Sequence, residues 1–278
     1  MHGHFWRTRL RELGLRPRGR LSQAFLEDER IAAAIVRAAR LDKTRDQVLE
    51  VGPGLGALTQ RLADAAHRVV AIEIDPALAD ALRAELSAAN VTVCTADVLR
   101  TDIAALFTQP FVVVANLPYH ITSPVLRHLL AAGPPSAARL VIMVQKEVGD
   151  RISAAPGDMS ALAVITQAQA RVTSLREVPR SAFYPPPKVD SVVLRLEPIE
   201  DVVRVIRRAE IEDFSRFVHA GFKQPRKQLA NSLSEGLGVD KADAVALLST
   251  AQVEPTRRPQ QLGVPEWAHL FRAWRARR

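Results

Sequence analysis

The chain has 278 residues, of which 47% are apolar and 24% charged, a balance typical of a globular protein with a sizeable core. Its one cysteine, Cys94, excludes a disulfide framework and a cysteine-based zinc site, and we expect it to be a buried thiol. No apolar run approaches the roughly 20 residues that cross a bilayer, and the basic start lacks the apolar stretch of a signal peptide. We therefore expect a cytoplasmic protein with no membrane partner.

Positive charge is concentrated at the two ends of the chain. Residues 1–20 hold six Arg and one Glu, and residues 201–278 hold fourteen Lys or Arg against nine Asp or Glu, so each end carries a net +5 within a total of +8. The residues between them are nearly neutral. Basic ends around a neutral middle indicate that the flanks hold a polyanion while the middle performs chemistry. A solvated, arginine-rich surface explains the same distribution, so charge alone leaves both interpretations open.

Up to residue 145, apolar runs of strand length alternate with stretches of helical spacing. This alternation is typical of parallel βαβ units, with helices on both faces of a sheet and ligands at the carboxyl ends of its strands. The expected strands are 47–51, 68–73, 91–95, 111–115 and 138–145, and the expected helices are 29–40, 57–66, 76–88 and 124–132.

The pattern is less regular after residue 145 and changes near residues 197–200. We expect 161–169, 172–178 and 189–196 to be further strands, or a helix, that close the sheet. Beyond them the spacing is helical to the end, in 202–210, 214–222, 226–237, 241–249 and 265–275. The predicted domains are a basic N-terminal arm (1–20), an α/β domain with a mostly parallel sheet (21–200) and a small C-terminal all-α domain (201–278).

A glycine-rich turn follows the first predicted strand and opens a helix. Residues 50–56 read Glu-Val-Gly-Pro-Gly-Leu-Gly, and glycines there let the backbone approach a ligand without Cβ clashes. The spacing is G-x-G-x-G, which matches neither the G-x-G-x-x-G of a dinucleotide fold nor a P-loop. The turn therefore favours neither a pyrophosphate nor a triphosphate.

Carboxylates fall at the ends of the next two predicted strands. Glu73 can accept hydrogen bonds from ribose hydroxyls, and Asp97 can accept one from an adenine amine. Asp75 is the alternative ribose ligand, although it precedes Pro76 in an N-cap-like position. With the glycine turn, the two carboxylates predict an adenosine without phosphates, as in S-adenosylmethionine.

The segment Asn116-Leu117-Pro118-Tyr119 follows the fourth predicted strand and suits chemistry on an amino nitrogen of a flat ring. The exocyclic amine of adenine is a poor nucleophile, because its lone pair is delocalised into the ring. The side-chain oxygen of Asn116 and the backbone carbonyl of Leu117 can accept hydrogen bonds from such an amine, and Tyr119 can stack on the ring. The structural alternative is an Asn-Pro turn with a Tyr packed behind it.

Several segments between residues 21 and 233 together resemble one known family. They are Ser22–Asp28, Glu50–Gly56, Ile72–Asp75, Asp97, Asn116–Tyr119, Phe183–Ser191 and Arg226–Leu233. The chain is similar in them to the KsgA-type small-subunit ribosomal RNA adenine dimethyltransferases. The resemblance implies a Rossmann-like class I S-adenosylmethionine-dependent methyltransferase domain, followed by a helical RNA-binding domain.

The resemblance also implies roles for particular residues, and no metal. The methyl donor would be contacted by Leu26, Gly52, Glu73, Asp97 and Asn116, and the target adenine would lie between Tyr119 and Phe183. Three prolines follow Phe183 and hold an extended segment that suits an aromatic platform, with a core aromatic as the alternative. The chain departs from the family at Ala24, where Asn is usual, so at most a backbone contact to the donor is left there.

The implied activity is dimethylation of N6 on two adjacent adenosines in a loop near the 3′ end of small-subunit (16S) rRNA. The implied partner is this RNA in an immature ribosomal particle, bound by a monomer that acts in ribosome biogenesis. We expect Arg226–Lys227, Arg257–Arg258 and Arg275–Arg278 to grip RNA phosphates, with a solvated helix face as the alternative. His120 is not expected to transfer a proton, and Lys188 either meets a phosphate or caps its loop.

Three rival functions remain open. A large-subunit rRNA adenine methyltransferase of the macrolide-resistance type shares the glycine turn, but Asn116–Tyr119, Phe183–Lys188 and Arg226–Leu233 favour the small-subunit interpretation. A DNA adenine or protein glutamine methyltransferase would more typically have Pro-Pro-Tyr at 117–119. A non-catalytic ribosome-assembly factor on this fold would be expected to have lost its site residues, which are intact here.

Overall fold

The computed structural model describes residues 5–21, 23–118, 121–201 and 204–277. The chain forms two compact units. The first, which we call the sheet unit, comprises Met1–Gly149 and Thr173–Pro198, and the second, the helical unit, comprises Asp150–Val172 and Ile199–Arg278.

The predicted boundary at residue 200 needs one correction, since residues 150–172 belong to the helical unit. The reason is α7 (Ala161–Gln167), whose buried Ala163 and Val164 join the apolar core of that unit. Whether a short apolar segment closes the sheet or joins another core depends on distant contacts. The local spacing of 161–169 left that choice open.

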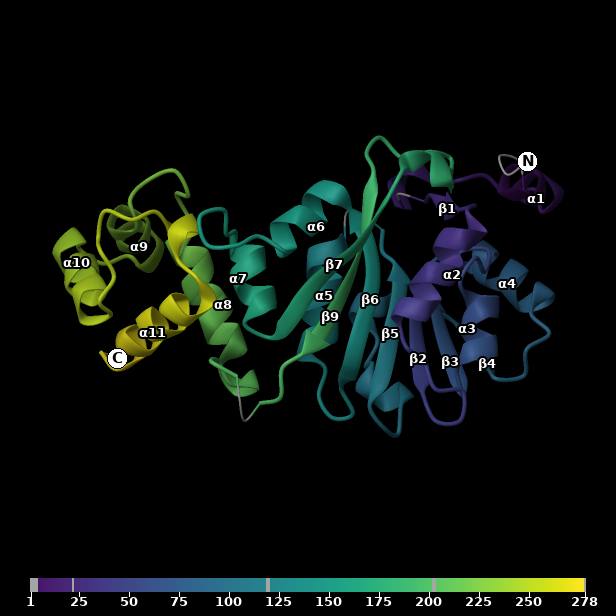
Figure 1. Ribbon diagram of the computed structural model, residues 1–278, viewed down its shortest axis with the longest axis horizontal. Helices are drawn as coiled ribbons and strands as arrows, with labels where there is room; N and C mark the ends of the chain where they lie inside the picture. Colours follow the sequence, from purple (N-terminus) through teal and green to yellow (C-terminus); the bar gives the residue numbers. More distant parts are fainter. Residues whose placement is uncertain (1–4, 22, 119–120, 202–203, 278) are drawn as a thin grey trace. The chain divides into compact units, whose positions relative to one another are not determined.

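A seven-stranded sheet with strand order β4-β3-β2-β5-β6-β9-β7 forms the centre of the sheet unit (Figure 1). Strands β2 to β6 are parallel to one another, and β9 is antiparallel to β6, so the predicted mostly parallel sheet is confirmed. The turns after β2, β3, β4 and β5 therefore meet at one edge of the sheet. The strands are β2 (Gln47–Val51), β3 (Arg68–Glu73), β4 (Val91–Thr95), β5 (Phe111–Asn116), β6 (Ala137–Gln145), β7 (Ala170–Val178) and β9 (Ser191–Pro198).

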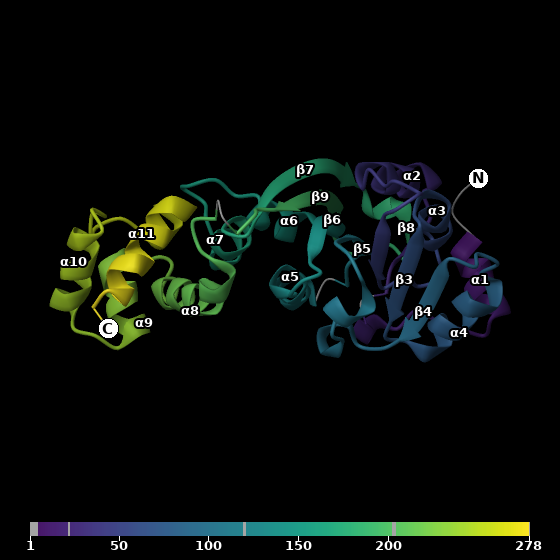
Figure 2. The same ribbon diagram turned by 90° about the horizontal axis from the view of Figure 1, so that it is seen from below.

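Helices cover both faces of this sheet, with α2, α3 and α4 on one side and α5 on the other (Figure 2). Every residue of β2 is buried, as expected of a strand covered on both faces. No helix in the described ranges is long and apolar enough to span a bilayer. The helices of this unit are α2 (Glu29–Ala38), α3 (Thr59–Ala65), α4 (Pro76–Glu85), α5 (Thr122–Ala131) and α6 (Lys146–Ile152), of which the last begins in it.

The N-terminal arm, expected only from its charge, contains the helix α1 (Phe5–Glu12). Its buried residues are Trp6 and Leu10, one turn apart, which pack with Leu55 and Leu78 of the sheet unit. After the arm, the short strand β1 (Phe25–Leu26) pairs antiparallel with β8 (Phe183–Tyr184) in a separate two-stranded sheet.

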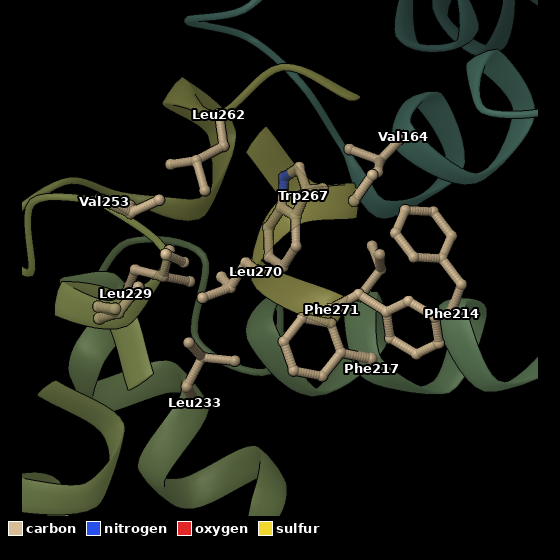
Figure 3. Packing of buried hydrophobic residues seen from close by; sticks show 14 of the residues in the cluster. Val164, Phe214, Phe217, Leu229, Leu233, Val253, Leu262, Trp267, Leu270 and Phe271 are labelled. Carbon is tan, nitrogen blue, oxygen red and sulfur yellow. The ribbon is translucent and has the colours of Figure 1, made fainter. Parts of the chain in front are cut away.

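The helical unit is built around aromatic side chains (Figure 3). The ring of Phe271 lies edge-on to Phe214, with their centroids 5.5 Å apart, and Phe217 meets Trp267 at 6.2 Å. A Cβ at Gly236 would lie 2.1 Å from the Ala220 carbonyl oxygen, so only glycine permits this close crossing of two helices. The helices are α8 (Ile211–Gly221), α9 (Leu229–Leu237), α10 (Lys241–Thr250) and α11 (Val264–Arg275).

Two predicted helix boundaries in this unit were wrong. Within the predicted helix 202–210, residues 204–207 are not helical and 208–210 form one 3-10 turn; residues 202 and 203 lie outside the described residues. The helix predicted from Arg226 begins at Leu229. There the Ser232 hydroxyl donates to the Gln224 carbonyl (2.8 Å) and accepts from its N–H (3.1 Å), which holds the preceding residues in a turn.

Candidate active site

A cavity opens at the edge of the sheet where the parallel strands end. All five side chains or turns predicted to contact a methyl donor line it: Leu26, Gly52, Glu73, Asp97 and Asn116. They come from β1 and from the ends of β2, β3, β4 and β5, which the parallel order brings together. The described residues that line the cavity include several with carboxyl groups and no Lys or Arg.

The glycine turn has a backbone that glycine adopts more readily than other residues. Gly52 and Gly54 have φ of 68° and 57°, in the left-handed region that side chains rarely adopt. A Cβ on Gly54 would also lie 3.2 Å from the Phe25 ring, a contact tight enough that the ring would have to shift to admit it. The Gly54 N–H donates to the Glu73 Oε2 (3.0 Å) and so joins the turn to the end of the next strand.

Glu73 is buried at the end of β3 and held by backbone donors. Its Oε1 accepts from the Asp75 N–H (2.9 Å) and its Oε2 from the Gly54 N–H. Burial raises the pKa of Glu73, and these two hydrogen bonds act in the opposite direction. Each oxygen keeps a further lone pair for a hydroxyl of a ligand in the cavity.

Asp75, the alternative ribose ligand, has structural partners instead. It is 3% exposed, caps α4 by accepting from the Ala77 N–H (3.2 Å), and does not line the cavity. Its carboxylate also accepts from the side chains of Gln23 (3.1 Å) and Arg18 (3.2 Å). Asp97 does line the cavity, and its Oδ1 accepts from the Leu99 N–H (3.0 Å) at the start of a 3-10 turn.

The orientation of Asn116 is set by a hydrogen bond to the backbone. Its Nδ2 donates to the Ala24 carbonyl (3.2 Å), which directs the other amide atom, the acceptor Oδ1, away from Ala24. Ala24, where the resemblance implies Asn, thus contributes through its carbonyl. The Leu117 N–H donates to the Met143 carbonyl (3.0 Å). Tyr119, predicted to stack on the target base, lies outside the described residues, as does His120.

Phe183 is not in the cavity. Its ring is 2% exposed and packs in the apolar cluster beneath β1, with β8 pairing it to Leu26. The family resemblance implied that this aromatic lies next to the target base, on a segment that the following prolines extend, and a core aromatic was the alternative. Those prolines predict a rigid segment but not the direction of the ring.

The cavity also has lining residues that were not predicted. Glu50, in the middle of the apolar strand β2, is 2% exposed, and burial raises its pKa from its ordinary value of 4.5 to about 8. A carboxyl group in a fully buried strand was a signal that could have identified it. Trp6 and Ile74 carry no such signal, because an aromatic in a basic arm and an apolar residue after a strand are both common.

The turn before α9 presents two basic side chains to solvent. Arg226 and Lys227 are exposed, and both lie in this turn and not on a helix as predicted. Among the described residues neither side chain has a hydrogen-bond or ion-pair partner. They have the character of a phosphate-binding pair.

Other predicted phosphate contacts have partners within the protein. Arg257 forms an ion pair with Glu266 (2.5 Å) and donates to the Gln261 carbonyl (2.6 Å). Arg275 forms an ion pair with Glu210. These two arginines therefore have partners within the protein, and their contact with RNA phosphates stays a prediction.

The sheet, the glycine turn and the cavity at the strand ends define a class I methyltransferase fold. The crystal structure of the 23S rRNA methyltransferase ErmE superposes with a TM-score of 0.70 at 31% identity, over 90% of this chain and 98% of that one. A dimethyladenosine transferase from Plasmodium falciparum superposes with a TM-score of 0.74 at 26% identity, over 88% and 95% of the two chains.

Sequence comparison narrows the class to a family. The profile described as Ribosomal RNA adenine dimethylase matches residues 14–272. Two relatives are named Ribosomal RNA small subunit methyltransferase A. The one from Dehalococcoides mccartyi is 41% identical over 260 residues, which cover 92% of this chain and 88% of the relative. The one from Moorella thermoacetica is 43% identical over 277 residues, which cover 95% of this chain and 94% of the relative. The chain belongs to the ribosomal RNA adenine dimethylase family.

Proposed function

We propose that this protein transfers two methyl groups from S-adenosylmethionine to N6 of each of two adjacent adenosines in a loop near the 3′ end of small-subunit rRNA. The observation that carries the proposal is the charge of the cavity. It has carboxyl groups at Glu73 and Asp97, beside a Glu50 that burial keeps protonated near pH 7, and no Lys or Arg among its described lining residues. Such a cavity repels nucleotide phosphates and suits an adenosine that carries a sulfonium and an ammonium group.

The residues fit the donor in a definite arrangement. The left-handed turn at Gly52 and Gly54 lets the backbone approach the donor, and the Glu73 carboxylate accepts hydrogen bonds from its ribose hydroxyls. Asp97, at the end of the next strand, accepts from the adenine amine, and Leu26 provides an apolar contact. When bound, the donor supplies an electrophilic methyl group on a positively charged sulfur.

The protein acts on the target adenine by positioning it. The Asn116 Oδ1 and the Leu117 carbonyl accept the two N–H groups of the amine, which directs the nitrogen lone pair at the methyl group. A nitrogen–carbon bond forms as the carbon–sulfur bond breaks, the sulfur becomes a neutral thioether, and the nitrogen releases a proton to water. Tyr119 and Phe183 hold the base between their rings. Because the Phe183 ring is buried in this structure, base entry requires that ring to turn outward.

The small subunit is the favoured substrate on two grounds. The relatives named for the small subunit are 41% and 43% identical to this chain, against 31% for the 23S rRNA methyltransferase. The segments Asn116–Tyr119 and Phe183–Lys188 also favour it. The exposed Arg226 and Lys227, with the basic arm, would hold RNA phosphates. The protein would act as a monomer on an immature particle in the cytoplasm.

The test is methyl transfer to small-subunit particles purified from a strain that lacks the modification. The wild-type protein should produce N6,N6-dimethyladenosine in the small-subunit RNA, measured by mass spectrometry of the digested RNA. Asn116→Ala should lower the turnover by roughly 10²–10³-fold while the particle still binds, because one acceptor for the amine is lost. The matched control is Gln60→Ala, which removes an exposed side-chain amide from α3 of the same unit. Its turnover should equal that of the wild type. Unaltered turnover in Asn116→Ala contradicts the site assignment.

A further inference from the structure

Trp6 forms part of the wall of the cavity, although it belongs to the arm and not to the sheet. It is 9% exposed, while its neighbour Phe5 on the same helix is 66% exposed. Its ring packs with Leu55, within the glycine turn, and with Leu78, in the helix that follows Glu73. An aromatic ring so placed excludes water from the donor side of the cavity.

The indole N–H of Trp6 makes a second contact. It donates to the Leu26 carbonyl at 2.6 Å, in a buried hydrogen bond that spans 20 residues of the chain. Leu26 ends the short segment that contains Ala24, and the Ala24 carbonyl is the acceptor that orients Asn116. A continuous set of contacts therefore leads from the arm, through residues 24–26, to the side chain that would hold the target amine.

Ion pairs fix the arm in this position. Arg9 of α1 pairs with Glu85 of α4, and Arg18 pairs with the buried Asp75 at 3.2 Å. Both acceptors follow the strand that ends in Glu73. The arm is thus joined to the donor-binding edge of the sheet by an apolar contact, a hydrogen bond and ion pairs.

We propose that Trp6 is a positioning residue for methyl transfer, with separate duties for its ring and its N–H. The ring closes the donor cavity and so contributes to donor affinity. The N–H holds residues 24–26 in place, so that Asn116 keeps its Oδ1 available to the amine, and so contributes to turnover. The inference rests on the proposed function, because it takes this cavity as the donor site.

Two substitutions separate these duties. Trp6→Phe keeps an aromatic wall but removes the indole N–H. Turnover should therefore fall about three- to tenfold, the factor expected for the loss of one net hydrogen bond, while the Kd for the methyl donor stays within about twofold of the wild-type value. Trp6→Ala also removes the wall and should raise the donor Kd by about tenfold or more. Thr8→Ala, on the exposed face of the same helix, should change neither quantity. Calorimetric titration with S-adenosylhomocysteine gives the Kd and the fraction of folded sites.

The outcomes distinguish the inference from the function on which it rests. Wild-type protein that binds no S-adenosylhomocysteine refutes the donor site itself. Binding by the wild type, with unchanged turnover in Trp6→Phe and unchanged Kd in Trp6→Ala, overturns the role of Trp6 alone. So does a loss of turnover that is fully explained by a smaller fraction of folded sites.

A measurement on the wild-type protein covers the case in which the variants do not fold. In protein labelled with 5-fluorotryptophan, S-adenosylhomocysteine should shift the fluorine resonance of Trp6. Trp267 and Trp274 do not line the cavity and serve as internal references. The Trp274→Phe variant assigns one reference resonance. A Trp6 resonance that does not move at saturating S-adenosylhomocysteine contradicts the proposal.

Discussion

Replacing the buried Glu50 by Gln should stabilise the protein, and more so at pH 8 than at pH 5. Burial raises the pKa of Glu50 from 4.5 to about 8, and the nearby Glu73 acts in the same direction. Below pH 4.5 the carboxyl group is neutral in the folded and the unfolded chain. Between pH 4.5 and 8 the unfolded chain ionises while the folded chain keeps its proton, so wild-type stability falls as the pH rises.

The size of the effect follows from the interval between the two pKa values. One pKa unit corresponds to about 1.4 kcal/mol, so the rise of the Glu50 pKa from 4.5 to about 8 limits the loss to roughly 5 kcal/mol. Nearly 1 kcal/mol of this is already lost at pH 5, which leaves roughly 3–4 kcal/mol between pH 5 and pH 8. For a unit of this size, that difference corresponds to a Tm difference of about 10 °C.

Calorimetric unfolding of the wild type and Glu50→Gln at a series of pH values tests this. The Tm of the variant minus that of the wild type should grow steadily from pH 5 to pH 8. Glu29→Gln removes a carboxyl group whose side chain is 80% exposed, and its difference from wild type should stay small and nearly constant. Parallel Tm curves for Glu50→Gln and the wild type would refute the reasoning.

Further substitutions test the cavity and the RNA contacts. Glu73→Gln should weaken S-adenosylhomocysteine binding by roughly tenfold to a hundredfold in calorimetry, because one backbone N–H then faces an amide NH₂; an unchanged Kd would contradict the ribose assignment. Gly54→Ala should abolish detectable binding with the fold retained by circular dichroism, since φ is 57° and the Phe25 ring lies 3.2 Å from the new Cβ. The double variant Arg226→Gln, Lys227→Gln should flatten the salt dependence of RNA binding by about two units of slope, and an unaltered slope would remove these residues from the RNA contact.

The sheet was predictable because the local pattern and the tertiary environment agree there. The run Phe111–Ala115 is apolar and fully buried, and the glycine turn after β2 has a left-handed backbone that glycine adopts readily. The helix α1 was not predicted, because only Trp6 and Leu10 mark it and both are buried by residues far along the chain. The assignment of residues 150–172 to the helical unit also depends on contacts with residues far along the chain.

The site was predictable to the extent that strand ends determine it. Glu73, Asp97 and Asn116 end or follow three parallel strands, so the topology alone brings them to one cavity. The direction of the Phe183 ring was not available from its sequence, since packing in the cluster beneath β1 decides it. Trp6 reaches the cavity only through the fold of the arm.

Analysis of both ribosomal RNAs after reaction with the purified protein tests the central proposal most directly. Small- and large-subunit particles from a strain that lacks the modification would be incubated separately with S-adenosylmethionine, and the digested RNA analysed by mass spectrometry. We predict N6,N6-dimethyladenosine at two adjacent positions near the 3′ end of the small-subunit RNA and none in the large-subunit RNA. Dimethyladenosine in the large-subunit RNA, or in neither, would contradict the proposed function.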